Sequence, residues 1–328
     1  MKLIIRIAAG MIGIAISQTS LYGQQTPPQD PITQKFFATA MGSISPAPRI
    51  MPLYDGPIPN SKAGPDEEGA ADFPGMVQKV SNPTIKVFLP AKLKGNGSSI
   101  IIFPGGGYVS LSLLMEGDEV AKNFQDHGFA AFVVKYRLPS DQIMEDKSIG
   151  PLQDAQQAIR VVREHAKEWI LNPARIGVIG FSAGGHLAST LGTHFEKSYI
   201  PNPDQVNLRP DFMILVYPVI SMDPKIAHMG SRIALLGDHP VEDSVKLFSN
   251  ETQVTEKTPP TLIIQAADDH LVDVDNSIVF FEALRHHDVS VDMTILEKGD
   301  HGLFLLARDD WQSIIFSWLD KHNWSKPQ

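Results

Sequence analysis

Residues 175–191 read RIGVIGFSAGGHLASTL, and this stretch decides the fold class. Its apolar first part predicts a buried strand, and its small-residue second part predicts a helix that packs closely on a sheet. Between them lies Gly-Phe-Ser-Ala-Gly at 180–184, whose glycines permit a tight and strained turn. Such a turn raises a serine hydroxyl above the end of a sheet, so Ser182 is a candidate nucleophile and the N–H of Ala183 a candidate oxyanion donor.

A serine hydroxyl is a weak nucleophile that needs a histidine base oriented by a carboxylate. Asp268 and Asp269 follow the predicted strand at 261–266, and His301 follows the next predicted strand. The chain order of serine, acid and histidine is the one that nucleophiles on a strand-to-helix turn use. The spacing alone leaves either aspartate as the partner of His301.

A glycine run lies upstream of the serine, in Pro-Gly-Gly-Gly-Tyr at 104–108. It comes directly after a predicted strand, and glycines let the backbone approach a developing oxyanion and donate N–H groups to it. A phosphate-binding loop is the competing interpretation. The lysine and the helix start of a P-loop are missing from this stretch, which favours the oxyanion role.

Strands and helices alternate from Thr84 onward, a pattern typical of a mostly parallel sheet covered by helices on both faces. The predicted strands are 98–103, 130–136, 175–179, 212–217, 261–266 and 291–296. The predicted helices are 117–127, 151–169, 183–193, 276–286 and 309–321. The stretch 218–257 interrupts the alternation and is long enough to predict a cap or rim insertion. The expected fold class is therefore α/β.

The N-terminal part of the chain has a different composition. Two basic residues precede an apolar run at 7–16, so we expect a signal peptide at 1–23. Residues 24–75 are rich in proline, glycine and serine and predict an extended arm, followed by a catalytic domain at 76–328. We therefore expect a periplasmic or secreted protein that is not stably inserted in a membrane after signal removal.

Composition limits the partners of the chain. Its 328 residues carry a net charge of −9, and 43% of them are hydrophobic. An acidic chain without a basic run is a poor ligand for nucleic acid. The chain has no cysteine, which excludes zinc–thiolate sites, and its histidines lack metal-ligand spacing, so we expect no metal and no cofactor.

Several stretches resemble the α/β-hydrolase family over roughly residues 80–322. Within that family the chain is similar to an exported bacterial branch related to bifunctional acetyl-xylan and feruloyl esterases. The longer matches are PGGGY at 104–108, KYRLP at 135–139, LQDA at 152–155 and GFSAGGHLA at 180–188. The resemblance implies an α/β-hydrolase fold and hydrolysis of short acyl esters, chiefly acetyl, on plant-wall xylan or its oligosaccharides. Feruloyl esters are the alternative substrate.

The resemblance also implies roles for single residues. It places oxyanion donors at Gly106 and Gly107, beside Ala183, with Pro104 where the family usually has a histidine.

It further selects Asp269 as the partner of His301, because the family's aspartate lies three residues before a valine, here Val272. We also expect the substrate cleft to be lined by Tyr108, Glu116, His228 and Trp311.

Two other functions compete with an esterase. A peptidase of the prolyl-oligopeptidase type usually carries a large upstream propeller, which about 50 proline-rich residues cannot build. A carbohydrate-binding pseudo-enzyme has no need of an intact serine, aspartate, histidine and glycine loop. The sequence therefore predicts acyl transfer in which Ser182 attacks an ester, His301 acts as base and Asp269 orients the imidazole.

Overall fold

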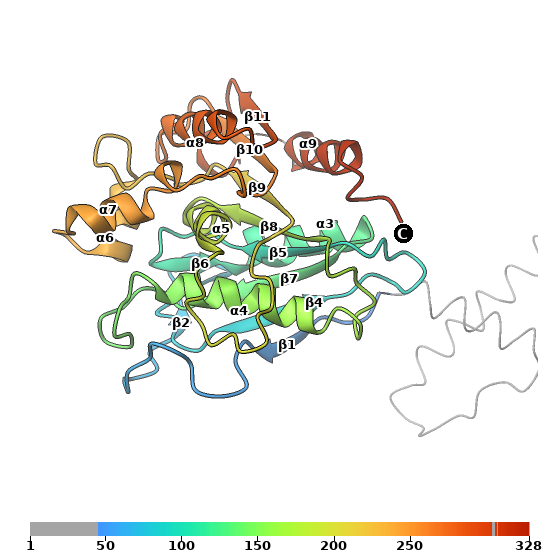
Figure 1. Cartoon of the computed structure of the whole chain (residues 1–328), viewed down its shortest axis with the longest axis horizontal. Coiled ribbons are helices and arrows are strands. Elements are labelled where there is room, and N and C mark those ends of the chain that lie inside the picture. The colour runs from blue at the N-terminus through green and yellow to red at the C-terminus, as the bar shows by residue number, and fades with distance from the viewer. Residues whose placement is uncertain (1–44, 304–305, 307, 328) are drawn as a thin grey trace, which may run out of the picture. The chain divides into compact units, whose positions relative to one another are not determined.

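A central sheet of eight strands organises the computed structural model, which describes residues 45–303, 306 and 308–327 (Figure 1). The spatial order is β1 (Arg49–Pro52), β4 (Thr84–Phe88), β7 (Ala130–Lys135), β5 (Ser99–Phe103), β8 (Ile176–Phe181), β9 (Phe212–Val216), β10 (Thr261–Ala266) and β11 (Val291–Leu296). The strands from β7 to β11 are parallel, whereas β1 and β4 pair antiparallel at one edge. The signal peptide predicted at 1–23 lies outside the described residues.

Helices cover both faces of this sheet (Figure 1). One face carries α4 (Gly150–Glu164), α5 (Ala183–His194) and α8 (Asp275–His286), and the other carries α3 (Glu119–Asp126) and α9 (Arg308–Lys321). Strand β5 shows why both faces need a cover of helices: most of its side chains are apolar, and they point alternately to the two faces of the sheet. Ile101 and Phe103 pack into the core with α4 and α5, whereas Ile100 and Ile102 pack with α3 and α9. The α/β prediction is confirmed.

Shorter elements surround this core. A second, three-stranded sheet contains β2 (Gly69–Ala70), β3 (Met76–Gln78) and β6 (Ser110–Ser112). Between β9 and β10, where an insertion is predicted, the chain forms α6 (Met229–Leu236), α7 (Glu242–Phe248) and a 3₁₀ turn (Asn250–Thr252). None of the helices in the described residues is long and apolar enough to cross a membrane.

Two predicted helices have different bounds in the structure. The helix expected at 117–127 is preceded by a π-helical turn at Leu113–Asp118, and α3 begins only at Glu119. Gly117 lies in that turn, where a Cβ would come within 3.0 Å of the Val133 side chain, so glycine brings the backbone close to the sheet. The helix expected at 151–169 ends at Glu164, after which the chain turns.

A buried ion pair joins three parts of the chain. Arg137, which follows β7, donates to Asp154 on α4 at 2.8 Å from Nη2, and neither side chain is exposed. Another guanidinium nitrogen of Arg137 donates to the Pro59 carbonyl at 2.9 Å, and the hydroxyl of Tyr54 donates to Asp154 at 2.9 Å. Because a buried charge is costly unless it is paired, this network firmly attaches residues 54–61 to the sheet.

Candidate functional site

Ser182 lies at the turn between β8 and α5, with φ 51° and ψ −119°, a conformation that residues other than glycine avoid. Hydrogen bonds hold the turn: the N–H of Ser182 donates to the Val216 carbonyl at 3.1 Å, and its own carbonyl accepts the N–H of Gly185 at 2.9 Å. A Cβ on Gly184 would overlap the carbonyl oxygen of Phe103. Glycine therefore lets α5 begin directly against the end of β5.

His301 lies beside Ser182 and links it to a carboxylate. Its Nε2 is 3.0 Å from the Oγ of Ser182, and its Nδ1 is 2.9 Å from Oδ2 of Asp269. The other carboxylate oxygen accepts the N–H groups of Leu271 and Val272 at 3.0 and 2.9 Å, which fixes the carboxylate. When Nδ1 donates to Asp269, Nε2 is free to accept the proton of the serine hydroxyl.

Asp268, the alternative partner of His301, makes a different contact. Its Oδ1 accepts the N–H of Asp300 at 2.9 Å. Asp300 has a positive φ of 53°, and its carboxylate accepts the N–H of His301 at 2.7 Å. Asp268 therefore stabilises the loop that carries the histidine, and the geometry places Asp269 against the imidazole.

The glycine loop after β5 lies against the turn of Ser182, because a Cβ on Gly105 would lie 2.9 Å from the Cβ of Ser182. Gly106 and Gly107 have φ values of 133° and 65°, which glycine adopts at low cost. Within the described residues, the N–H groups of Gly106, Gly107 and Ala183 have no hydrogen-bond partner. Three N–H groups near the serine are thus available to a ligand oxygen.

Glu116 supports the glycine loop with a buried carboxylate. Its Oε2 accepts the N–H of Gly105 at 2.6 Å, and its Oε1 accepts the hydroxyl of Tyr217 at 3.0 Å. Burial raises the pKa of Glu116, an effect that these two hydrogen bonds and the nearby His301 oppose. The ring of Tyr217 lies edge-on to the imidazole of His301, with centroids 4.9 Å apart. Glu116 therefore connects the glycine loop to the ring that packs on the histidine.

A comparison with known protein families identifies the family of this chain. The family model described as BD-FAE matches residues 85–284, more than half of the chain, including the glycine loop, Ser182 and Asp269. The chain belongs to the BD-FAE family.

Two relatives of this BD-FAE chain have names that refer to xylan. It is 41% identical over 219 residues to the acetylxylan esterase of Xylanibacter ruminicola, an alignment that covers 66% of this chain and 42% of that protein. It is 34% identical over 216 residues to endo-1,4-beta-xylanase B of Butyrivibrio fibrisolvens, covering 65% of this chain and 33% of that protein. The BD-FAE chain thus spans less than half the length of either relative.

Solved structures agree on the fold. The acetyl ester-xyloside bifunctional hydrolase of Caldicellulosiruptor lactoaceticus superposes with a TM-score of 0.70 at 36% identity, covering 84% of this chain and 97% of that one. An α/β hydrolase from a deep-sea metagenome library superposes with a TM-score of 0.55 at 26% identity, covering 76% and 98%. The BD-FAE chain has the α/β-hydrolase fold.

Tyr108, predicted to line the cleft, is a buried ring whose hydroxyl is already bound. The hydroxyl donates to Nδ1 of His186 at 2.9 Å, and Nε2 of His186 donates to the Phe248 carbonyl at 2.8 Å. Burial lowers the pKa of His186 to about 4, so the imidazole is neutral at pH 7. In this BD-FAE chain His186 connects the glycine loop to the end of α7 and lies apart from the base position.

His228, a second predicted cleft residue, is the N-cap residue of α6 and borders the glycine loop. Its Nδ1 accepts the N–H of Ser231 at 3.3 Å, and its Cε1 lies 3.8 Å from the position that a Cβ on Gly107 would take. Burial and the proximity of His301 lower the pKa of His228. A neutral imidazole that accepts at Nδ1 presents an Nε2–H donor near the site.

Trp311, the remaining predicted cleft residue, is buried against Phe181, with ring centroids 6.3 Å apart. Together with Glu116 and Tyr217 it lines a cavity of about 230 Å³. Glu116 and Trp311, two of the predicted cleft residues, therefore line the same cavity.

Two residues at the site were missed by sequence reasoning. Tyr217 follows β9 and packs on His301, as described above. Gln265, on β10, donates from Nε2 to Oδ2 of Asp269 at 3.0 Å and accepts the hydroxyl of Ser277 at 2.7 Å. Both residues lie near the carboxyl ends of parallel strands, where such sheets bind ligands, and this position could have identified them as site residues. Over the described part of the chain, no group of three or more His, Asp or Glu side chains could hold a metal ion.

Proposed function

We propose that this chain is an exported serine carboxylesterase that removes short acyl groups, chiefly acetyl, from xylan or xylo-oligosaccharides. The observation that carries the chemistry is the continuous series of hydrogen bonds from Ser182 through His301 to Asp269, next to three N–H groups without partners. The xylan-related names of the relatives support the substrate class. The basic and apolar residues near the N-terminus support export to the periplasm or medium.

The first half of the reaction acylates the serine. Ser182 Oγ attacks the ester carbonyl carbon while its proton passes to Nε2 of His301, and Asp269 stabilises the resulting imidazolium. The N–H groups of Gly106, Gly107 and Ala183 bind the oxyanion that forms on the carbonyl oxygen. The tetrahedral intermediate then collapses, and the sugar alkoxide leaves with the proton from His301.

The second half regenerates the enzyme. Water gives a proton to His301 and attacks the acyl carbon, and the same three N–H groups bind the second oxyanion. Collapse expels Ser182, which recovers its proton, and the carboxylic acid is released. Every proton is carried by this chain's own side chains, so the mechanism calls for no cofactor.

The test uses the mature protein and a Ser182→Ala variant. Wild type is expected to release acetate from acetylated xylan and nitrophenolate from p-nitrophenyl acetate, and the variant is expected to do neither above background. An organophosphonate should add its mass to wild type only, at the peptide that contains Ser182. Equal activity of the two proteins would refute the nucleophile, and activity confined to methyl ferulate would refute the acetyl preference.

A further inference from the structure

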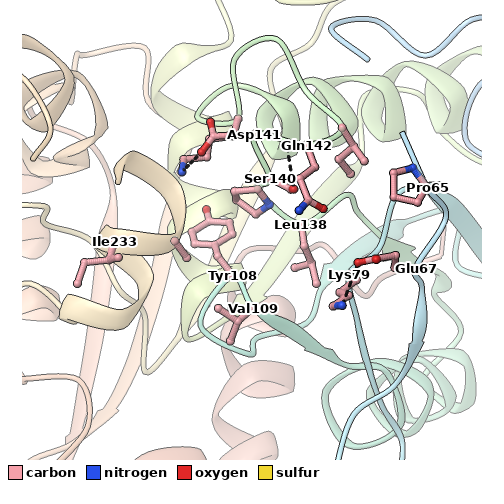
Figure 2. Close-up of a pocket in the computed structure, with 14 residues that line it drawn as sticks. Pro65, Glu67, Lys79, Tyr108, Val109, Leu138, Ser140, Asp141, Gln142 and Ile233 are labelled. Atoms are coloured by element: carbon pink, nitrogen blue, oxygen red, sulfur yellow. Dashed lines mark hydrogen bonds and ion pairs between the residues drawn. The ribbon is translucent and has the colours of Figure 1, made fainter. Parts of the chain in front are cut away.

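A groove of about 510 Å³ opens beside the glycine loop (Figure 2). Tyr108 and Val109, which directly follow Gly107, line it, and its volume lies within the range of about 300–1,000 Å³ typical of ligand pockets. A Cβ on Gly107 would lie 3.8 Å from both Val109 and His228. The groove is therefore continuous with the loop proposed to bind the oxyanion.

Three segments outside the proposed reaction centre form the other walls. Pro65, Glu67 and Lys79 come from the N-terminal part, residues 138–143 come from the connection after β7, and Ile233 belongs to α6. Figure 2 shows Ile233 on one side of Tyr108 and the Glu67–Lys79 pair on the other. Hydrolysis itself requires none of these residues, so their convergence calls for a separate role.

Hydrogen bonds fix two of these walls, the N-terminal segment and the connection after β7, to each other. The backbone N–H of Lys62 donates to the Ile143 carbonyl at 2.9 Å, and its Nζ donates to the Asp141 carbonyl at 3.0 Å. The buried Arg137 holds Pro59 in the same segment. A preformed groove binds with little loss of conformational entropy, which favours its use as a binding site.

The charges in the groove suit an uncharged ligand with many hydroxyl groups. Lys79 pairs with Glu67 at 2.9 Å and Lys147 pairs with Asp141 at 2.6 Å, so the charged residues that line the groove sum to zero. Such groups offer strong hydrogen bonds of both polarities to hydroxyls.

Apolar side chains complete the surface. Val109 is 64% exposed and Ile233 is 40% exposed, which leaves apolar area for the C–H faces of a sugar ring. A phosphorylated or uronate ligand would instead favour a surplus of positive charge.

We propose that this groove binds the sugar chain of the ester, with the xylosyl units next to the acetylated unit lying across Val109 toward Lys79. This inference rests on the proposed function and names the subsite for the alcohol side of its substrate. Ester hydrolysis of a small aryl acetate does not need the groove, whereas cleavage of an acetylated oligosaccharide does.

The experiment compares kcat/KM for acetylated xylotriose with kcat/KM for p-nitrophenyl acetate. Lys79→Ala is expected to lower the ratio of these two values about tenfold, the effect expected of one hydrogen bond to a charged group. Ile233→Ser removes apolar contact with the sugar and is expected to lower the ratio by a similar factor, about tenfold. Lys257→Ala is a matched control, because Lys257 forms an ion pair of similar exposure with Glu196. Ile170→Ser is the apolar control, since Ile170 is 69% exposed and does not line the groove. Both controls should leave the ratio unchanged.

The outcomes separate the groove from the chemistry. If wild type deacetylates xylotriose and the groove variants keep the ratio of the controls, the groove proposal is overturned and the proposed function stands. If wild type hydrolyses p-nitrophenyl acetate and releases no acetate from xylotriose, the substrate class and the groove both fall. Calorimetry, in which unacetylated xylotetraose is titrated into the Ser182→Ala variant, should show binding. Adding Lys79→Ala to that variant should weaken the binding about tenfold. Absence of binding at millimolar sugar would contradict the proposal.

Discussion

Replacing Glu116 tests whether its carboxylate positions the glycine loop or contacts substrate. In Glu116→Ala the N–H of Gly105 and the hydroxyl of Tyr217 lose their acceptor, and an unsatisfied buried donor costs about 1–3 kcal/mol. We expect the loop to shift so that Gly105 regains a partner, which displaces Gly106 and Gly107. Since loss of one oxyanion donor lowers kcat by about 10²–10³, kcat should fall at least ~100-fold.

The Michaelis constant is expected to change little, by about threefold or less, because oxyanion donors stabilise the transition state more than the bound ester. Glu116→Gln retains one acceptor for Gly105 and nearly the same shape. It replaces charge-assisted hydrogen bonds by neutral ones that are about half as strong, so its kcat should fall only ~10-fold.

Steady-state rates with p-nitrophenyl acetate give both constants, and circular dichroism checks that each variant is folded. Glu251→Gln is the matched control: burial also raises the pKa of Glu251, but its carboxylate accepts from Ser221. That variant should stay within about twofold of wild type in kcat. A tenfold rise in KM at unchanged kcat for Glu116→Gln would refute the positioning role and would indicate that Glu116 contacts the substrate.

Two further predictions concern the histidines and their partners. Asp269→Asn should lower kcat about 10⁴-fold, because the imidazole loses its orienting carboxylate. Asp268→Asn should lower kcat less than tenfold, because its amide oxygen can still accept the N–H of Asp300. A larger loss of kcat at Asp268 than at Asp269 would reverse the assignment. Because burial depresses the pKa of His186 from 6.5 to about 4, the stability it contributes is fully present above pH 6.5 and is lost as pH falls toward 4, about 3 kcal/mol in all. Urea denaturation between pH 7 and 4 should show this loss in wild type and a flatter profile in His186→Gln, and parallel profiles would contradict it.

The sequence predicted the parts of the site that depend on local backbone chemistry. Ser182 and the glycine loop lie in short motifs whose turns require glycine, and the order of strands and helices follows from hydrophobic periodicity. Adjacent aspartates cannot be told apart by such patterns, because their different partners, Asp300 and His301, come from a distant loop.

Long-range contacts account for what the sequence did not predict. Glu116 was expected to line the cleft, and its support of the glycine loop was not predicted. Its bond to Tyr217 spans 101 positions and forms only when β9 lies beside β8. Arg137 is a similar case: it lies in the stretch KYRLP at 135–139, but the sequence predicted no role for its side chain. Its partners Pro59 and Asp154 come from separate segments that meet only after folding.

The groove beside the glycine loop also affects how this protein can change over evolutionary time. Its walls come from the segment around the short strands β2 and β3, from the connection after β7 and from α6, whereas Ser182, Asp269 and His301 follow strands of the central sheet. Insertions and substitutions are tolerated in connections far better than in strands. New ligands could thus be acquired by altering residues 65–79, 138–147 or α6 without moving the serine, which makes these three segments the natural targets for a mutant library.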